Sequence, residues 1–243
     1  ALALTDHNGL YGSMEFAHAA RRVNVQPITG AEVTLRDCFP GVEEPEGGHH
    51  VTLLAETPQG YANLCRLLTE AHMGSERGDT RLALPSLLEL SEGLILLSGC
   101  AQSPVAAAMR SSVADGEAFT RKLLDVFGPG SMFMELQDNA VKGDTARNKT
   151  LARLAGRMGL GVVATSNVHY HRPERHRLQD VLVSIKNRAT LDGAHGARRA
   201  NKLFHLPEPW DMRHRFESRP EALTNTLLIA ERGAAFDLTE DLG

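Results

Sequence analysis

Residues 93–100 read GLILLSGC, a strand-length apolar run that ends in a glycine and a potential metal ligand. The arrangement recurs along the chain, because short apolar runs alternate with longer segments that have helical spacing. This alternation is typical of βα units around a parallel sheet, so we expect an α/β protein. The six predicted strands are residues 1–5, 26–35, 51–55, 93–98, 131–136 and 161–165.

Amphipathic helices are predicted between these strands. Pro85 and Pro104 stand where helices would begin, and Gly128 and Gly159 stand where helices would end. The apolar stripes that follow the i, i+3, i+4, i+7 spacing are Tyr61, Leu64, Cys65, Leu68 and Leu151, Leu154, Ala155, Met158. After residue 171 we find no further strand, and we divide the chain into a barrel (1–171) and a helical extension of the same domain packed on it (172–243).

Composition describes an ordinary globular chain. Apolar residues make up 42% of 243 residues, the net charge is −4, and no apolar run approaches the length of a membrane span. The net charge argues against a protein whose whole surface binds nucleic acid. Three cysteines at unrelated spacings, without a signal peptide, favour a reducing compartment, and we expect a cytoplasmic protein without a membrane partner.

One segment departs from this charge balance. Residues 171–202 contain eight Lys or Arg against three Asp or Glu, which gives +5 and leaves −9 for the rest of the chain. This charge suits a surface that faces phosphate or a partner. We favour the simpler interpretation, a solvated helix with its charges outside and its apolar stripe inside. That stripe is Leu178, Val181, Leu182 and Ile185.

Residues of metal-ligand type stand at the ends of several predicted strands, where parallel α/β folds gather functional groups. One such residue would carry little weight, but imidazole, carboxylate and thiolate at one edge suit Zn, Mn or Fe. We do not expect a closed structural zinc site, because no CxxC or HxxxH spacing occurs and the candidates are spread over the whole sheet. The candidates selected in this way are Asp6, His7, Glu32, Cys100, Glu135, Asn167 and His169.

A family resemblance makes these candidates specific. The strings ALALTDHNGLYG, ITGAEVTL, GLILLSGC, FMELQDN and VVATSNVHYHRPERHRLQDVL occur in this order. They resemble the PHP (polymerase and histidinol phosphatase) domain of bacterial C-family DNA polymerases, of the polymerase III alpha subunit type. Within that group they are most like the error-prone branch. The resemblance implies a distorted seven-stranded, TIM-like βα barrel, which here would lack its first strand.

The resemblance also implies a cluster of up to three divalent metal ions at the ends of the strands. Three of its ligands, His7, Glu32 and His169, would act in catalysis through the bound metal. Asp6, Glu135 and Asn139 would orient ligands without binding the ion. The assignment of His50 as a ligand rests on the resemblance alone, and His49 is the alternative. The implied ligands are His7, Glu32, His50, Cys100, Asn167 and His169.

Some family positions differ or are missing. The chain begins inside an apolar run without Met, so we expect an upstream segment. The resemblance implies that this segment carries the family's His-x-His motif and a following aspartate, which together supply three further ligands. Asn167 stands where the family has an aspartate ligand, and an amide brings no negative charge to a cation. Asn139 stands where the family has a histidine.

The resemblance implies metal-dependent phosphodiester hydrolysis of the 3′ to 5′ exonuclease type, weakened or lost by these differences. Its setting would be an error-prone polymerase in DNA replication and repair, with DNA and other polymerase or repair subunits as partners. One alternative is a non-catalytic domain that stabilises the polymerase or binds a partner. A second is a free-standing PHP phosphatase that acts on a small phosphate ester.

Overall fold

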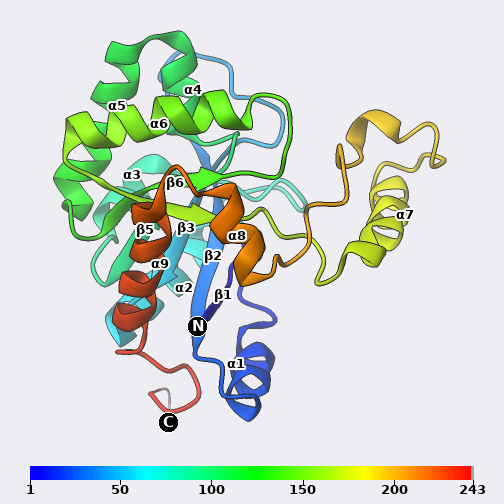
Figure 1. Ribbon diagram of the computed structural model, residues 1–243. Helices are drawn as coiled ribbons and strands as arrows, with labels where there is room; N and C mark the ends of the chain where they lie inside the picture. The colour runs from blue at the N-terminus through cyan, green and yellow to red at the C-terminus, as the bar shows by residue number, and fades with distance from the viewer. Residues whose placement is uncertain (242–243) are drawn as a thin grey trace.

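The architecture is a curled sheet surrounded by helices (Figure 1). The computed structural model describes residues 1–241 and confirms the expected α/β class. The strands are β1 (Leu2–Leu4), β2 (Pro27–Arg36), β3 (His49–Ala55), β4 (Leu82–Ala83), β5 (Leu94–Leu97), β6 (Met132–Gln137) and β7 (Gly161–Thr165). The helices are α1 (Ser13–Arg22), α2 (Pro58–Met73), α3 (Leu84–Glu89), α4 (Pro104–Ser111), α5 (Val113–Phe127), α6 (Asp144–Met158), α7 (His176–Lys186), α8 (Pro209–Arg215) and α9 (Pro220–Gly233), with short 3-10 helices η1 (Pro173–Arg175) and η2 (His195–Ala197).

The order of the strands is β1-β2-β3-β5-β6-β7, and the two-residue strand β4 pairs with the end of β2. Most neighbouring strands run parallel, but β3 runs antiparallel to both β2 and β5. The expectation of an all-parallel sheet is therefore wrong at β3. The cause is the connection before it, because residues 37–48 contain no crossover helix and such a link suits antiparallel neighbours.

The predicted strands and helix ends agree with the structure to within two residues. Pro104 begins α4, and the Ser103 hydroxyl caps this helix by accepting a hydrogen bond from the Ala106 N–H. Gly128 and Gly159 end α5 and α6 at φ angles of +73° and +69°, which glycine adopts without steric cost. None of the helices in residues 1–241 combines the length and the apolar character that a membrane span requires.

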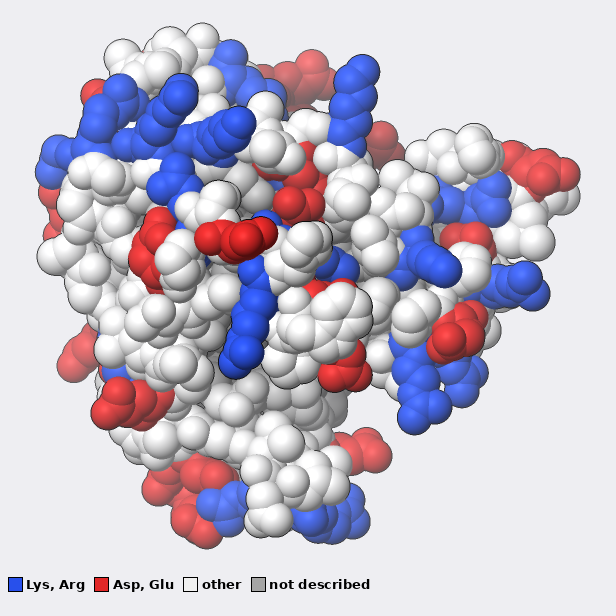
Figure 2. Space-filling model, in the orientation of Figure 1, with Lys and Arg blue, Asp and Glu red and all other residues white. Residues whose placement is uncertain are grey.

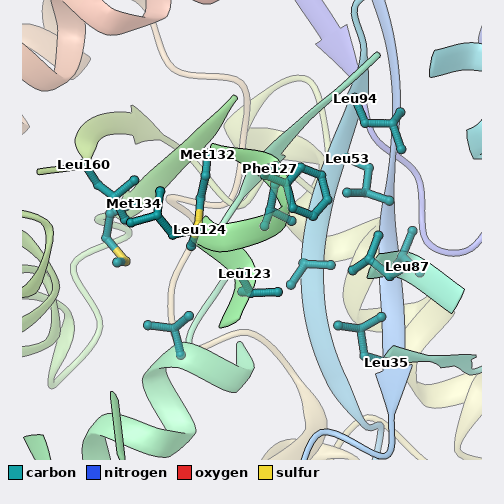
Figure 3. Packing of buried hydrophobic residues seen from close by; sticks show 14 of the residues in the cluster. Leu35, Leu53, Leu87, Leu94, Leu123, Leu124, Phe127, Met132, Met134 and Leu160 are labelled. Carbon is teal, nitrogen blue, oxygen red and sulfur yellow. The ribbon is translucent and has the colours of Figure 1, made fainter. Parts of the chain in front are cut away.

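The larger apolar core lies between the outer face of the sheet and the helices. Leu123 and Phe127 of α5 and Met132 and Met134 of β6 belong to this cluster of buried residues (Figure 3). Leu123 and Met132 are completely buried. Burying a side chain of this size stabilises the fold by about 1.5–3 kcal/mol. The apolar contacts on this face therefore stabilise the packing of the helices against the curled sheet.

The inner face of the sheet changes from apolar to polar along the strands. At one end, Ile28, Leu54, Phe133 and Val163 pack with Ile229 of α9. Alternate residues of a strand share a face, so the same face continues into polar side chains. These side chains are Glu32, His50, Thr52, Glu135, Gln137 and Thr165. The inner face of the sheet therefore has an apolar end and a polar end, and the polar end carries the candidate ligands.

The residues after β7 form two parts. Helix α9 packs against β7, where the Asn225 side-chain N–H donates to the Val162 carbonyl at 2.7 Å. Residues 171–204, which contain α7 and are called the lobe below, project away from the sheet (Figure 1). The Asn201 side-chain N–H ties the lobe to the loop after β6 by donating to the Asn139 carbonyl at 2.8 Å.

The apolar stripe of α7 is exposed, which corrects our expectation that it lies inside. Leu178 is 49% exposed and Ile185 is 67% exposed, and Val181 and Leu182 between them are also exposed. The lobe projects from the barrel, so among residues 1–241 no element covers this stripe. Amphipathic spacing predicted the helix correctly but not a partner for its apolar face.

Candidate metal centre

The first two candidate ligands are placed by main-chain pairing that continues past the end of β1. His7 forms a parallel bridge with Glu32 of β2. The Glu32 N–H donates to the Asp6 carbonyl at 3.1 Å, and the Asn8 N–H donates to the Glu32 carbonyl at 2.9 Å. Asn8 has a φ of +50°, a left-handed conformation that asparagine tolerates well. The backbone thus fixes the His7 side chain beside that of Glu32.

The Glu32 carboxylate joins two imidazoles. Its Oε1 atom lies 2.7 Å from His50 Nδ1 and 3.4 Å from His7 Nε2. The ligand atoms of the three residues all lie within 4.8 Å of one another. A fourth donor is close, because Cys100 Sγ lies 3.6 Å from His50 Nδ1. Imidazole, carboxylate and thiolate donors at these separations match the ligand set of a transition-metal site.

The second nitrogen of the His50 ring fixes its orientation. Nε2 lies 3.0 Å from the Gly47 carbonyl, to which an Nε2–H group donates. Metal-binding histidines commonly use one nitrogen in this way, which points the other at the ion.

The loop that carries Cys100 is equally constrained. Gly99 has a φ of +91°, and a Cβ atom there would lie 2.1 Å from the His50 carbonyl oxygen. Only glycine therefore allows the loop after β5 to approach the start of β3 so closely.

The cluster contains a negatively charged carboxylate, Glu32, and a positively charged imidazole, His50. Burial raises the pKa of Glu32, but the hydrogen bond from His50 and the nearby imidazoles outweigh burial and hold this pKa below its usual value. Burial lowers the pKa of His50, but Cys100 and Glu32 outweigh it and raise this pKa to about 10. The Glu32–His50 pair thus holds a proton between its ligand atoms, and a cation bound there would replace it.

His169 completes the edge of the site from the loop after β7. Its Nε2 atom is buried and has no hydrogen-bond partner among residues 1–241. Burial, together with the charges of Arg199 and His7, lowers the pKa of His169 to about 4, so the imidazole is neutral. A buried, neutral nitrogen without a partner is unusual, and a metal ion would satisfy it. The donor chemistry of the cluster and this nitrogen both fit a bound divalent cation.

Part of the cluster opens into a cleft of about 630 Å³. His7, Glu32 and His169 line one part of it, while Ile28 and Ile229 line another. The volume falls in the range of small-molecule sites.

Comparison with known families decides between the possible kinds of metal protein. Residues 1–139, more than half of the chain, match the family described as PHP domain. The chain belongs to the PHP domain family. His7, Glu32, His50 and Cys100 all lie within the matched part of this PHP domain.

Relatives of this PHP domain are DNA polymerases. It is 39% identical over 249 residues to the error-prone DNA polymerase of Symbiobacterium thermophilum, covering 96% of this chain and 22% of the relative. It is 37% identical over 237 residues to the error-prone DNA polymerase of Mycolicibacterium paratuberculosis, with the same coverage. It is 34% identical over 239 residues to DNA polymerase III subunit alpha of Thermus aquaticus, covering 95% of this chain and 20% of the relative. The chain thus spans about a fifth of the length of these relatives.

The two asparagines that differ from the family pattern have different surroundings. Asn167 lines the cleft, and its main-chain N–H donates to Asn139 Oδ1 at 3.3 Å. Asn139 is buried, and its Nδ2 atom donates to the Leu203 carbonyl at 2.9 Å and to Ser166 Oγ at 3.3 Å. Asn139 therefore joins the loop after β7 to the lobe, whereas Asn167 lines the cleft together with His7, Glu32 and His169.

Glu135 and Asp6 lie next to the cluster but outside it. Glu135 is buried and accepts hydrogen bonds from the Gly99 N–H at 3.1 Å and from Gln137 Nε2 at 3.0 Å. Its pKa is raised, chiefly by burial. Through Gly99 it helps to hold the Cys100 loop. The Asp6 side chain is exposed, and its main-chain carbonyl is the group that contacts Glu32.

In the sequence we looked for metal-ligand residues at the ends of predicted strands, which we call the strand-end rule. The direction of β3 explains why this rule did not select His50. The rule searches the last residues of strands, but β3 is antiparallel and brings its first residues to the edge where the parallel strands end. His50 points into the cluster, whereas the buried His49 packs on the opposite face, with its ring against Phe39. The structure thus favours His50 over His49.

No local pattern distinguished Arg199, which we counted only as one of eight basic residues in its segment. Its charge contributes to lowering the pKa of both His7 and His169. A cation therefore faces the cluster from the lobe.

Proposed function

We propose that this chain is the PHP domain of an error-prone DNA polymerase that acts in DNA replication and translesion repair. We further propose that its metal centre hydrolyses phosphodiester bonds at the 3′ end of DNA. The observation that carries the proposal is the convergence of His7, Glu32 and His50 within 4.8 Å. The similarity to error-prone DNA polymerases supports the setting, with DNA and other polymerase or repair subunits as partners in the cytoplasm.

The residues have distinct tasks in this proposal. His7, Glu32, His50 and Cys100 would hold a divalent Zn, Mn or Fe ion, and the uncharged His169 in the loop after β7 would offer its unpartnered Nε2 atom. A bound ion supplies an activated water and neutralises charge on the phosphate. Glu32 keeps its negative charge because its pKa is low, and it balances the charge of the cation.

We propose that hydrolysis is weak. Asn167 offers an amide oxygen without charge to the cleft, and Asn139 uses its side chain to hold the lobe. These two positions favour the second candidate function, a PHP domain that stabilises the polymerase or binds a partner without catalysis. We also propose that residues 1–171 form the barrel unit and that residues 172–243 extend it.

Metal loading and hydrolysis test the proposal. The purified full-length polymerase proposed here is incubated with Mn²⁺, Zn²⁺ or Fe²⁺ and desalted, its metal content is measured by mass spectrometry, and a 5′-labelled oligonucleotide is offered. We expect bound metal and a ladder shortened from the 3′ end, both strongly reduced in Glu32→Gln. His18→Ala, which changes an exposed histidine on α1, is the matched control.

The outcomes separate the candidate functions. A full-length protein that binds none of the three metals contradicts the enzyme and leaves the non-catalytic domain. Cleavage of p-nitrophenyl phosphate without cleavage of the oligonucleotide favours a phosphatase of small esters. Asn167→Asp should raise both metal content and rate, and no gain in either would argue against a weakened catalytic centre.

A further inference from the structure

A second cavity lies in the lobe, outside the metal centre. Its volume is about 320 Å³, and residues of α7 and residues 199–202 line it. Arg199 and Lys202 bring positive charge to the cavity, and Asp180 brings the one carboxylate among its lining residues. Asp180 is paired with Arg198, whose Nη1 atom lies 3.4 Å from its Oδ2 atom. Among residues 1–241, no carboxylate forms an ion pair with Arg199 or Lys202, so the cavity favours an anion.

Arg199 connects this cavity to the metal centre. Its guanidinium lies over the ring of Phe204, 5.1 Å from the ring centre. The Phe204 ring centre lies 6.0 Å from that of His169, and the Phe204 carbonyl accepts a hydrogen bond from the His169 N–H at 2.8 Å. The buried Phe204 ring thus holds Arg199 beside a candidate ligand.

The charge of the lobe is suited to a phosphate chain. Residues 171–202 carry +5 while the rest of the chain carries −9. Figure 2 shows Lys and Arg side chains over the projecting lobe, with fewer acidic side chains among them. Proteins that bind single strands use a positively charged groove that follows the backbone. The lobe places such charge next to the cleft in which a terminal phosphodiester would lie.

We propose that the lobe cavity is a second phosphate subsite, which holds an internal phosphate of a single DNA strand while the terminal phosphodiester lies at the metal centre. The inference rests on the proposed function and narrows its substrate class. A strand offers one phosphate to each site, with Arg199 between them and Lys202 in the cavity. A small phosphate monoester offers one phosphate only and leaves the second subsite unused.

Binding without metal tests the subsite directly. The affinity of a fluorescein-labelled pentathymidylate is measured by anisotropy in EDTA at several salt concentrations. Lys202→Ala should weaken binding about tenfold at low salt and reduce the slope of log affinity against log salt by about 0.7, which corresponds to one lost phosphate contact.

Arg177→Ala is the matched control, because Arg177 lies on α7 and does not line the cavity. It removes the same charge from the lobe, so a general electrostatic effect would weaken both variants equally. Equal losses in Lys202→Ala and Arg177→Ala, or no binding by the wild type, would overturn the subsite. Arg199→Ala should also weaken binding of the oligonucleotide, because Arg199 lines the cavity.

The binding assay and the hydrolysis assay fail independently. Binding in EDTA that depends on Lys202, without hydrolysis in Mn²⁺, would keep the subsite and overturn the catalytic proposal. The opposite result is hydrolysis in Mn²⁺ together with an oligonucleotide affinity that Lys202→Ala leaves unchanged. That result would keep the catalytic proposal and overturn the subsite.

Discussion

At the scale of single residues, the candidate site depends on one shared carboxylate oxygen. Glu32 Oε1 contacts both His50 and His7, so the charge of one side chain organises two imidazoles. The pKa shifts of Glu32 and His50 are opposite in direction, as expected for a carboxylate that accepts a hydrogen bond from an imidazolium. Without metal, the site is therefore stabilised by the hydrogen bond from protonated His50 to Glu32, and the free energy of unfolding depends on pH.

The pH dependence of this pair has a definite sign. The folded-state pKa of His50 is raised from 6.5 to about 10, so its stabilising contribution is complete below pH 6.5 and is lost as the pH rises through about 10. In EDTA, the stability difference between wild type and His50→Gln should therefore shrink from pH 6 to pH 10. Urea unfolding at several pH values measures it. A difference that stays constant with pH would contradict the paired imidazolium.

The glycine before Cys100 allows a second prediction at this scale. Gly99→Ala should lower the free energy of unfolding by more than about 2 kcal/mol, because the backbone is left-handed and the new methyl group meets the His50 carbonyl. Gly130→Ala is the control, since a Cβ atom there meets nothing within 4 Å and its change should stay within about 0.5 kcal/mol. If both variants unfold at the same urea concentration, the close approach of the two loops is not a constraint.

At the scale of elements, the direction of β3 and the exposed face of α7 were not predictable from periodicity. A period of two residues shows which side chains share a face, but strand direction depends on the connection between strands. The two-residue strand β4 is too short to have a period. The spacing in α7 showed that one face is apolar, and only the packing of the whole chain shows whether another element covers it.

The exposed stripe of α7 leads to a prediction about stability. Leu182→Gln and Ile185→Gln should each change the free energy of unfolding by less than about 0.5 kcal/mol, because both side chains already contact solvent. They should also reduce the binding of a hydrophobic dye. Leu123→Ala in α5, by contrast, should cost about 2–5 kcal/mol because Leu123 is completely buried. A loss in Leu182→Gln as large as that in Leu123→Ala would mean that the stripe is covered in solution.

At the scale of the whole molecule, the sequence located most strands and helix ends because each has a local cause. A strand has its apolar run, and a helix has a proline at its start or a glycine at its end, as at Pro104 and Gly128. The site was predictable only in part. His7, Glu32 and Cys100 follow the strand-end rule, whereas His50 needed the family resemblance. The position of Arg199 near the site depends on how the lobe packs against the barrel. No local sequence pattern predicts that packing.

Metal binding should stabilise the whole fold, since the candidate ligands come from strands far apart in the sequence. A divalent ion at 100 times its dissociation constant adds about 2.7 kcal/mol. For a chain of this size each kcal/mol raises the Tm by about 2–4 °C, so we expect a rise of about 5–11 °C. Thermal unfolding with Mn²⁺ and with EDTA measures the shift. Glu32→Gln should lose most of it, and an equal shift in that variant would place the ion elsewhere.

The side chain of Asn139 has a consequence for how this domain can change over evolution. Its amide spans Leu203 of the lobe and Ser166 beside the cleft, so one position anchors two segments. Replacing it with the histidine that the family resemblance implies here would add a potential ligand and remove this side-chain contact with the lobe in the same step. One residue cannot do both, so such a substitution becomes tolerable only after another contact has secured the lobe. Position 139 should therefore show strong epistasis with residues 201–204, and the order in which substitutions arise there decides which of them survive.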